Sequence, residues 1–139
     1  MAAELHQEGL QFLLEVALTQ EQSTPANFYI GLATDASLAE NATLASLTEV
    51  TGTGYARVAV ASDNVDITSA TTGTNDWKVT TKDVTFTATD DDWDGANTVF
   101  LATTVDGTGK LLASAPLSAT RTLGNGDTLT VALELVSTG

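Results

Sequence analysis

The acidic run at residues 90–95 has the spacing most typical of a chemical site. It reads Asp-Asp-Asp-Trp-Asp-Gly, so Asp90, Asp92 and Asp94 alternate and a glycine follows them. Oxygen ligands at alternate positions before a glycine open the EF-hand calcium loop. That loop ends in a bidentate Glu at its twelfth position, where this chain has Leu101. We therefore expect a solvated acidic hairpin turn without a bound metal, and a calcium loop of another type is the alternative.

Other catalytic chemistry has little support in the residue types. The chain has no Cys and a single His, His6, which excludes thiolate zinc sites, cysteine nucleophiles and a relay through two histidines. With 18 Asp and Glu residues, some carboxylate pair will by chance have the separation that glycoside hydrolysis needs. Only Glu49 and Glu134 have an unusually apolar sequence context. We expect His6 and Glu134 to face solvent, and we expect no catalytic residue and no cofactor.

The segment Gly54-Tyr55-Ala56-Arg57 contains the first basic residue of the chain, next to an aromatic residue. If residues 54–61 form a strand, Tyr55 and Arg57 share one face and Val58 and Val60 take the other. We expect Tyr55 and Arg57 on a half-exposed face near a subunit boundary. The planar fork of Arg57 suits a carboxylate, either from a neighbouring copy or from the same copy.

The two tryptophans, Trp77 and Trp93, could stack on sugar rings. Anchoring in a core or an interface is the commoner use of an aromatic side chain in a β-sandwich, and we expect that use here.

Composition limits the partners of the chain. Its 139 residues carry 18 acidic and five basic side chains, for a formal charge of −13. Binding to nucleic acid or to an anionic membrane surface depends on Lys and Arg, so neither partner is expected. The 25 Thr residues suit strands with one face in water, because a β-branched hydroxyl residue packs well there.

The N-terminal segment, residues 1–22, is expected to be helical, with a helix over residues 4–19. One apolar stripe follows the helical spacing: Leu10, Leu13, Leu14, Ala17 and Leu18. A terminal helix of this length is marginal without packing, so we expect the stripe to contact another molecule. The acidic start of the segment is unlike a secretory signal, and cytoplasmic synthesis is expected.

Residues 23–139 are expected to form a single β-sandwich domain of the jelly-roll or immunoglobulin-like type. Alternating apolar residues and turn signals recur at the spacing typical of such folds. Strands are expected at residues 27–34, 54–61, 77–81, 83–89, 97–104, 110–117, 120–123 and 127–136. Residues 62–76 are expected to be a long polar connection. Residues 38–49 are expected to form a short helix or two turns that bury Leu38, Leu44 and Leu47.

Several motifs in a fixed order resemble a family of small structural proteins of tailed bacteriophages. They are Thr24–Ala33, Leu47–Val50 leading into Gly54–Arg57, Thr98–Leu101 after a Trp-containing stretch, and Gly126–Leu129. The resemblance covers roughly residues 8–136. It implies a component of the virion, either a capsid decoration protein or a tail-associated protein, and it implies no catalytic residues.

The leading functional hypothesis is therefore a capsid decoration (cement) protein, assembled in the host cytoplasm. It would form a symmetric oligomer, expected to be a trimer. Its contacts with the major capsid protein, with other copies of itself, or with both are expected at Leu10, Leu13, Leu14, Leu18, Tyr55 and Arg57. The first alternative is a tail, baseplate or fibre-associated virion protein. The second is a calcium-dependent carbohydrate-binding module that uses Trp93 and the neighbouring aspartates.

Overall fold

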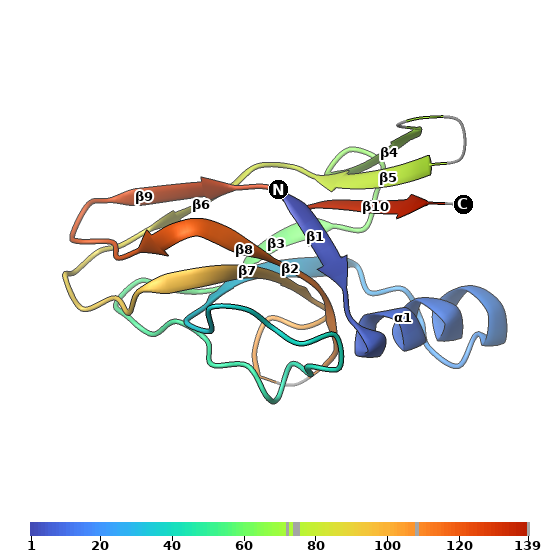
Figure 1. The fold of residues 1–139 in the computed structure, drawn as a ribbon, viewed down its shortest axis with the longest axis horizontal. Coiled ribbons are helices and arrows are strands. Elements are labelled where there is room, and N and C mark those ends of the chain that lie inside the picture. The colour runs from blue at the N-terminus through green and yellow to red at the C-terminus, as the bar shows by residue number, and fades with distance from the viewer. Residues whose placement is uncertain (72, 74–75, 108, 139) are drawn as a thin grey trace.

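The computed structural model describes residues 1–71, 73, 76–107 and 109–138, which form a layered β structure with one short helix (Figure 1). Within these residues the elements follow the order β1 (Ala2–Leu5), α1 (Gln7–Leu14), the π-helical segment η1 (Glu15–Thr19), β2 (Asn27–Ala33), β3 (Val58–Ala61), β4 (Ile67–Thr71), β5 (Asp76–Thr81), β6 (Val84–Thr87), β7 (Ala96–Ala102), β8 (Leu111–Arg121), β9 (Thr128–Val131) and β10 (Glu134–Thr138). This architecture confirms the expected mainly β fold with an N-terminal helix.

Eight strands form one sheet in the order β3-β2-β7-β8-β1-β10-β5-β4, and β6 pairs with β9 in a two-stranded sheet. All neighbouring pairs are antiparallel except β1 and β10, which are parallel with Ala2 opposite Glu134. The short strand β1 therefore joins two halves of the sheet, because β8 lies on one side of it and β10 on the other.

The large sheet folds over on itself (Figure 1). Strands β3, β2, β7 and β8 lie in one layer, and β10, β5 and β4 lie in the other. The β6–β9 pair continues the second layer beyond the point where β5 leads into β6. At this point the Thr81 N–H donates to the Leu133 carbonyl, and the Leu133 N–H donates to Thr81 Oγ1, both at 2.9 Å.

The main core fills the space between the layers. In β6, Val84 and Phe86 are buried and the threonines between and after them are exposed, as the period of two in the sequence predicts. The central strand β7 is buried on both faces, because Leu101 faces the main core and Phe100 faces a second, smaller core. Leu44 is buried in this second core under a segment of turns, which confirms turns in place of a helix over residues 38–49.

The N-terminal segment differs from its prediction as a continuous helix. Residues 2–5 form strand β1, and helix α1 begins only at Gln7. The backbone of Glu4 and Leu5 pairs with β8, and pairing with a sheet outweighs the helical pattern of this short acidic stretch.

Three further local predictions are wrong. The separate strands expected at residues 110–117 and 120–123 are one continuous strand, β8. The polar connection at residues 62–76 contains β4, an edge strand that pairs only with β5 and is exposed along most of its length, so it needs no apolar alternation. The strand expected at residues 127–136 is divided into β9 and β10, because β9 pairs with β6 whereas β10 pairs with β5 and β1. Among the described residues, no helix has the length and apolar character needed to cross a membrane.

Candidate interaction surface

Helix α1 packs closely on strand β8. Gly9 is buried, and a Cβ atom added to it would lie 2.4 Å from the Leu112 carbonyl oxygen, so only glycine permits this approach. One turn later, the Phe12 ring meets the Phe28 ring edge to face, with centroids 6.3 Å apart. The Gly9–Phe12 side of the helix is therefore part of the core.

Two polar side chains hold the start of the helix. His6 is fully buried, with Nδ1 3.0 Å from the Ala39 carbonyl oxygen and Nε2 2.7 Å from the Ser114 hydroxyl oxygen. A carbonyl only accepts, so Nδ1 carries the proton and Nε2 accepts from Ser114. Glu8 Oε2 accepts hydrogen bonds from the N–H groups of Leu44 and Leu111, at 3.0 and 2.7 Å. The expectation of a solvent-facing His6 is wrong because this residue precedes the helix and lies against β8.

The opposite side of the helical segment carries four exposed leucines. Leu10, Leu13, Leu14 and Leu18, here called the leucine stripe, are 47%, 38%, 46% and 74% exposed. The apolar spacing read from the sequence therefore marks a largely exposed side of the helical segment, and Leu13 lies at its edge toward the sheet layers. Contiguous apolar surface of this kind is typical of interaction sites.

Negative charge lies beside the leucine stripe. Glu15 faces partly into solvent and accepts a hydrogen bond from Gln11 at 2.7 Å, and Glu21 is exposed just after η1. The chain has no Lys or Arg before Arg57. Lys110 lies 3.7 Å from Glu8, and its charge offsets a carboxylate that already holds the start of the helix.

An apolar cavity of about 200 Å³ lies behind Leu13, between the helix and the two sheet layers. Its walls include Leu13, Phe28, Ile67, Val79, Leu133 and Leu135. A shallow, more open depression adjoins it, shares Phe28, Ile67 and Val79 with it, and is bordered by Asp63. Because Leu13 belongs both to the cavity wall and to the leucine stripe, the two form one continuous apolar surface.

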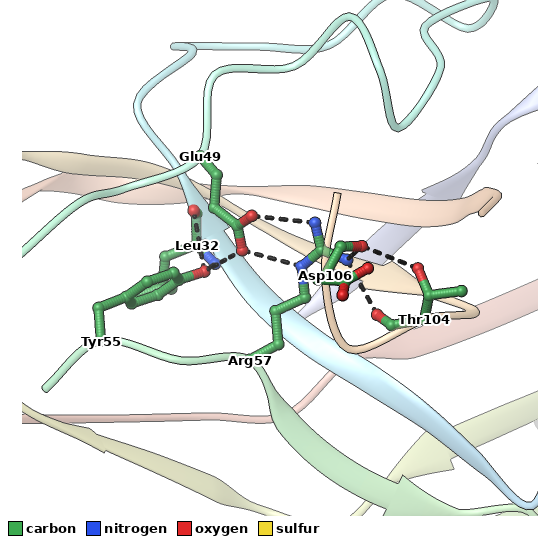
Figure 2. A network of polar contacts seen from close by, with 6 residues as sticks. All are labelled: Leu32, Glu49, Tyr55, Arg57, Thr104 and Asp106. Atoms are coloured by element: carbon green, nitrogen blue, oxygen red, sulfur yellow. Dashed lines mark hydrogen bonds and ion pairs between the residues drawn. The ribbon is translucent and has the colours of Figure 1, made fainter. Parts of the chain in front are cut away.

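Tyr55 and Arg57 meet at one carboxylate of the same chain (Figure 2). Glu49 Oε2 accepts from the Tyr55 hydroxyl at 2.7 Å and from Arg57 Nε at 2.9 Å, and Glu49 Oε1 accepts from Arg57 Nη2 at 2.9 Å. Arg57 Nη1 donates to the carbonyls of Thr104 and Asp106. We call Glu49, Tyr55 and Arg57 the buried triad.

The surroundings of the buried triad exclude most water. The Arg57 side chain is only 2% exposed and its guanidinium lies 5.2 Å from the centroid of the Phe100 ring. Burial is the main cause that raises the pKa of the Tyr55 phenol far above its ordinary value. The expected strand over residues 54–61 begins only at Val58, and Tyr55 packs against the same core as Val58 and Val60, so the predicted division into two strand faces is wrong. A half-exposed position for Arg57 is wrong as well. Its backbone precedes β3, and Gly54 (φ 87°) makes the turn that brings both side chains to Glu49.

The acidic run is docked on a neighbouring loop. Asp92 accepts hydrogen bonds from the backbone N–H and hydroxyl of Thr53 at 2.9 and 2.8 Å, and Asp94 accepts the same two bonds from Thr51 at 3.1 and 2.7 Å. These bonds hold the pKa values of both carboxyl groups below their ordinary value. Trp93 between them is 5% exposed and donates its indole N–H to the Thr53 carbonyl. We call residues 90–94 and 51–53 the acidic clasp.

The acidic clasp differs from the expected free hairpin turn. Strands β6 and β7, which flank residues 90–94, do not pair with each other but with β9 and with β2 and β8. Two of the metal candidates use their carboxylates within the acidic clasp, since Asp92 binds Thr53 and Asp94 binds Thr51. Within the described residues, no three His, Asp or Glu side chains converge as a metal site would require.

The remaining candidates are scattered. Trp93 is a core anchor, as expected, whereas Trp77 on β5 is 54% exposed. Glu134 lies 3.6 Å from Lys78, and both side chains are about one third exposed, in agreement with a solvated position. The structure thus separates the leucine stripe, which is exposed, from the buried triad, which is held inside the same chain. Sequence reasoning missed the cavity, because its walls come from seven elements that are distant in the sequence: α1, β2, β4, β5, β7, β8 and β10.

Comparison with protein families gives a match over almost the whole chain. A family model described as podophage GP4 fiber I protein gp80 matches residues 10–138, which include the leucine stripe, the cavity walls, the buried triad and the acidic clasp. The comparison with curated proteins finds no match.

Proposed function

Because the chain belongs to the podophage GP4 fiber I protein gp80 family, we propose that it is a fibre component of a short-tailed phage particle. The single observation that carries this proposal is the family match, which covers almost the whole β structure. Membership in this family agrees with the resemblance to tailed-phage structural proteins seen in the sequence motifs, and it makes the chain a virion-associated protein.

In the proposed function, the protein acts through contacts with other proteins and not by catalysis. The polar side chains of the buried triad, and those of His6 and Ser114, are engaged with one another. The surface feature left for a partner is apolar, the leucine stripe with its cavity. Such a surface suits a protein that is positioned among other proteins of a particle.

Capsid decoration is the second candidate, because the order of the sequence motifs also resembles decoration proteins. The two functions differ in place and copy number. A fibre component is present in a few to a few dozen copies at the tail, whereas a decoration protein covers the shell in hundreds of copies.

The test is gold labelling and cryo-electron microscopy of purified particles with an antibody against this chain. Particles from a phage that lacks the gene serve as the control for the label. Label and density at the tail support the fibre function. Label over the whole shell, together with heads that break at lower temperature when the gene is missing, would replace it with decoration.

A further inference from the structure

We propose that the leucine stripe and the cavity behind Leu13 form one docking site, and that its occupant is a positively charged amphipathic segment of another virion protein. This inference rests on the proposed function, because it takes the partner from within the particle. It adds to that function the location of the docking site and the chemistry of the partner, and it excludes a second copy of this chain as the occupant.

The apolar part of the site has an outer face, the leucine stripe, and an inner chamber, which is the cavity behind Leu13. Outside, Leu10, Leu14 and Leu18 follow one side of the helical segment and remain 46–74% exposed. Inside, the chamber of about 200 Å³ is walled by apolar residues such as Phe28 and Val79. A small molecule could fill the chamber but would leave the leucines in water. A protein segment that lies along the helix covers both.

The chamber is large enough for one aromatic side chain of the partner. Empty apolar cavities of about 150 Å³ stay dry and take up benzene-sized molecules. The cavity behind Leu13 exceeds that size, so a Phe ring carried by the partner fits it. An anchor of this kind, inserted at the centre of a flatter apolar contact, is how many interfaces gain most of their affinity.

Charge selects the partner. Glu15 and Glu21 lie beside the stripe, and residues 1–56 contain no Lys or Arg. Four of the five cations are already paired with carboxylates of this chain: Arg57 with Glu49, Lys78 with Glu134, Lys82 with Asp66 and Lys110 with Glu8. A second copy would bring its own Glu15 and Glu21 to the contact and a formal charge of −13 to the encounter. A segment with Lys or Arg beside its apolar face meets the opposite charge instead.

The binding test uses the isolated full chain and three fluorescent peptides of about 14 residues, which is about four helical turns. The first has Leu and one central Phe on one face and Lys on the other. The second has the same composition in scrambled order, and the third replaces the Phe by Ala. Fluorescence anisotropy measures their affinities for the wild type, for Leu10→Ser/Leu14→Ser and for Val105→Ser. The last variant is the matched control, since Val105 is 56% exposed outside the site.

We expect the amphipathic peptide to bind the wild type about tenfold more tightly than the scrambled one, and the double variant to lose about tenfold in affinity. Val105→Ser should bind like the wild type. Binding should weaken between about 50 and 300 mM NaCl, because salt screens the paired charges. In Val79→Phe, where the added ring occupies the cavity, the Phe and Ala peptides should bind equally. Circular dichroism of each variant establishes that it is folded.

Equal affinity of the amphipathic and scrambled peptides, or an unchanged affinity of the double variant, would overturn the proposal. Self-association of the wild type in sedimentation runs, lost in the double variant, would also overturn it and assign the surface to a second copy. The particle experiment tests the fibre function and the peptide experiment tests the docking site, so a negative result in one leaves the other proposal standing. Tail labelling without peptide binding refutes only the docking site, and shell labelling with peptide binding refutes only the fibre function.

Discussion

Replacing Glu49 by Ala should destabilise the protein more than any other removal of a single acidic side chain. Glu49 accepts three hydrogen bonds in the buried triad, two from Arg57 and one from Tyr55. Without it, the Arg57 guanidinium remains 2% exposed with only the carbonyls of Thr104 and Asp106 and the Phe100 ring as partners.

The size of the effect follows from burial. Removing one partner of a buried ion pair costs about 3–5 kcal/mol, because the other charge is left desolvated. The Glu49 side chain is itself 27% exposed, so water can enter the space it leaves, and we expect the lower end of that range. A loss of about 3 kcal/mol should lower the melting temperature by about 10 °C in a domain of this size.

Urea unfolding measures the loss directly. In a Trp77→Phe background the fluorescence reports on Trp93, whose ring lies 5.5 Å from the Tyr55 ring. Glu134→Ala is the matched control, since its 3.6 Å pair with Lys78 is about one third exposed and should contribute at most about 1 kcal/mol. The double variant Glu49→Leu/Arg57→Met should recover most of the stability, because it leaves no buried charge. Two results would contradict this prediction: a loss of unfolding free energy in Glu49→Ala no larger than in the control, or a double variant that is less stable than Glu49→Ala.

Three further predictions concern other contacts. Gly9→Ala should lower the free energy of unfolding by about 1–3 kcal/mol, measured in urea, because its Cβ would meet the Leu112 backbone; a variant as stable as wild type would show that α1 can shift outward. The lowered pKa values of Asp92 and Asp94 mean that the acidic clasp contributes its full stability above about pH 4 and loses it as the pH falls through those values. The urea concentration at the unfolding midpoint should therefore decrease when the pH is lowered below 4. A decrease of the same size in Asp92→Asn/Asp94→Asn, which lacks both carboxyl groups, would contradict this. The raised pKa of Tyr55 means that this residue contributes its full share to the free energy of unfolding below pH 10 and loses it as the pH rises further. During alkaline unfolding, the absorbance of tyrosinate should therefore increase in a late phase. This phase should be missing in Tyr55→Phe.

Local periodicity was sufficient to predict the layered β architecture. The alternation of Val84 and Phe86 with threonines predicts which face of β6 is buried, and the strand expected at residues 97–104 is present as β7. The helical spacing of Leu10, Leu14 and Leu18 likewise predicts a stripe. Periodicity reports only that residues share a face, however, and here that face is turned to solvent while Phe12 faces the core.

Choices between distant partners could not be predicted in the same way. Strand β4 is recognised only by its pairing with β5, and His6 is buried because β1 ends against β8, more than 100 residues later. The buried triad had a partial signal in the sequence: Glu49 in an apolar context, and Tyr55 and Arg57 two residues apart. Nothing in that signal chose between a carboxylate of the same chain and one of a neighbouring copy, because backbone turns make that choice.

The position of β1 also sets an order of events during folding. Ala2 and Ala3 are synthesised long before Glu134 and Leu135, the residues with which they pair. Until then β1 can pair with β8 on one side only, and the two halves of the large sheet remain unjoined. Closure of so non-local a contact is slow compared with the formation of hairpins such as β7–β8. Joining of the two halves should therefore follow synthesis of β10, and the nascent protein should remain open to proteolysis and to chaperones until that strand arrives.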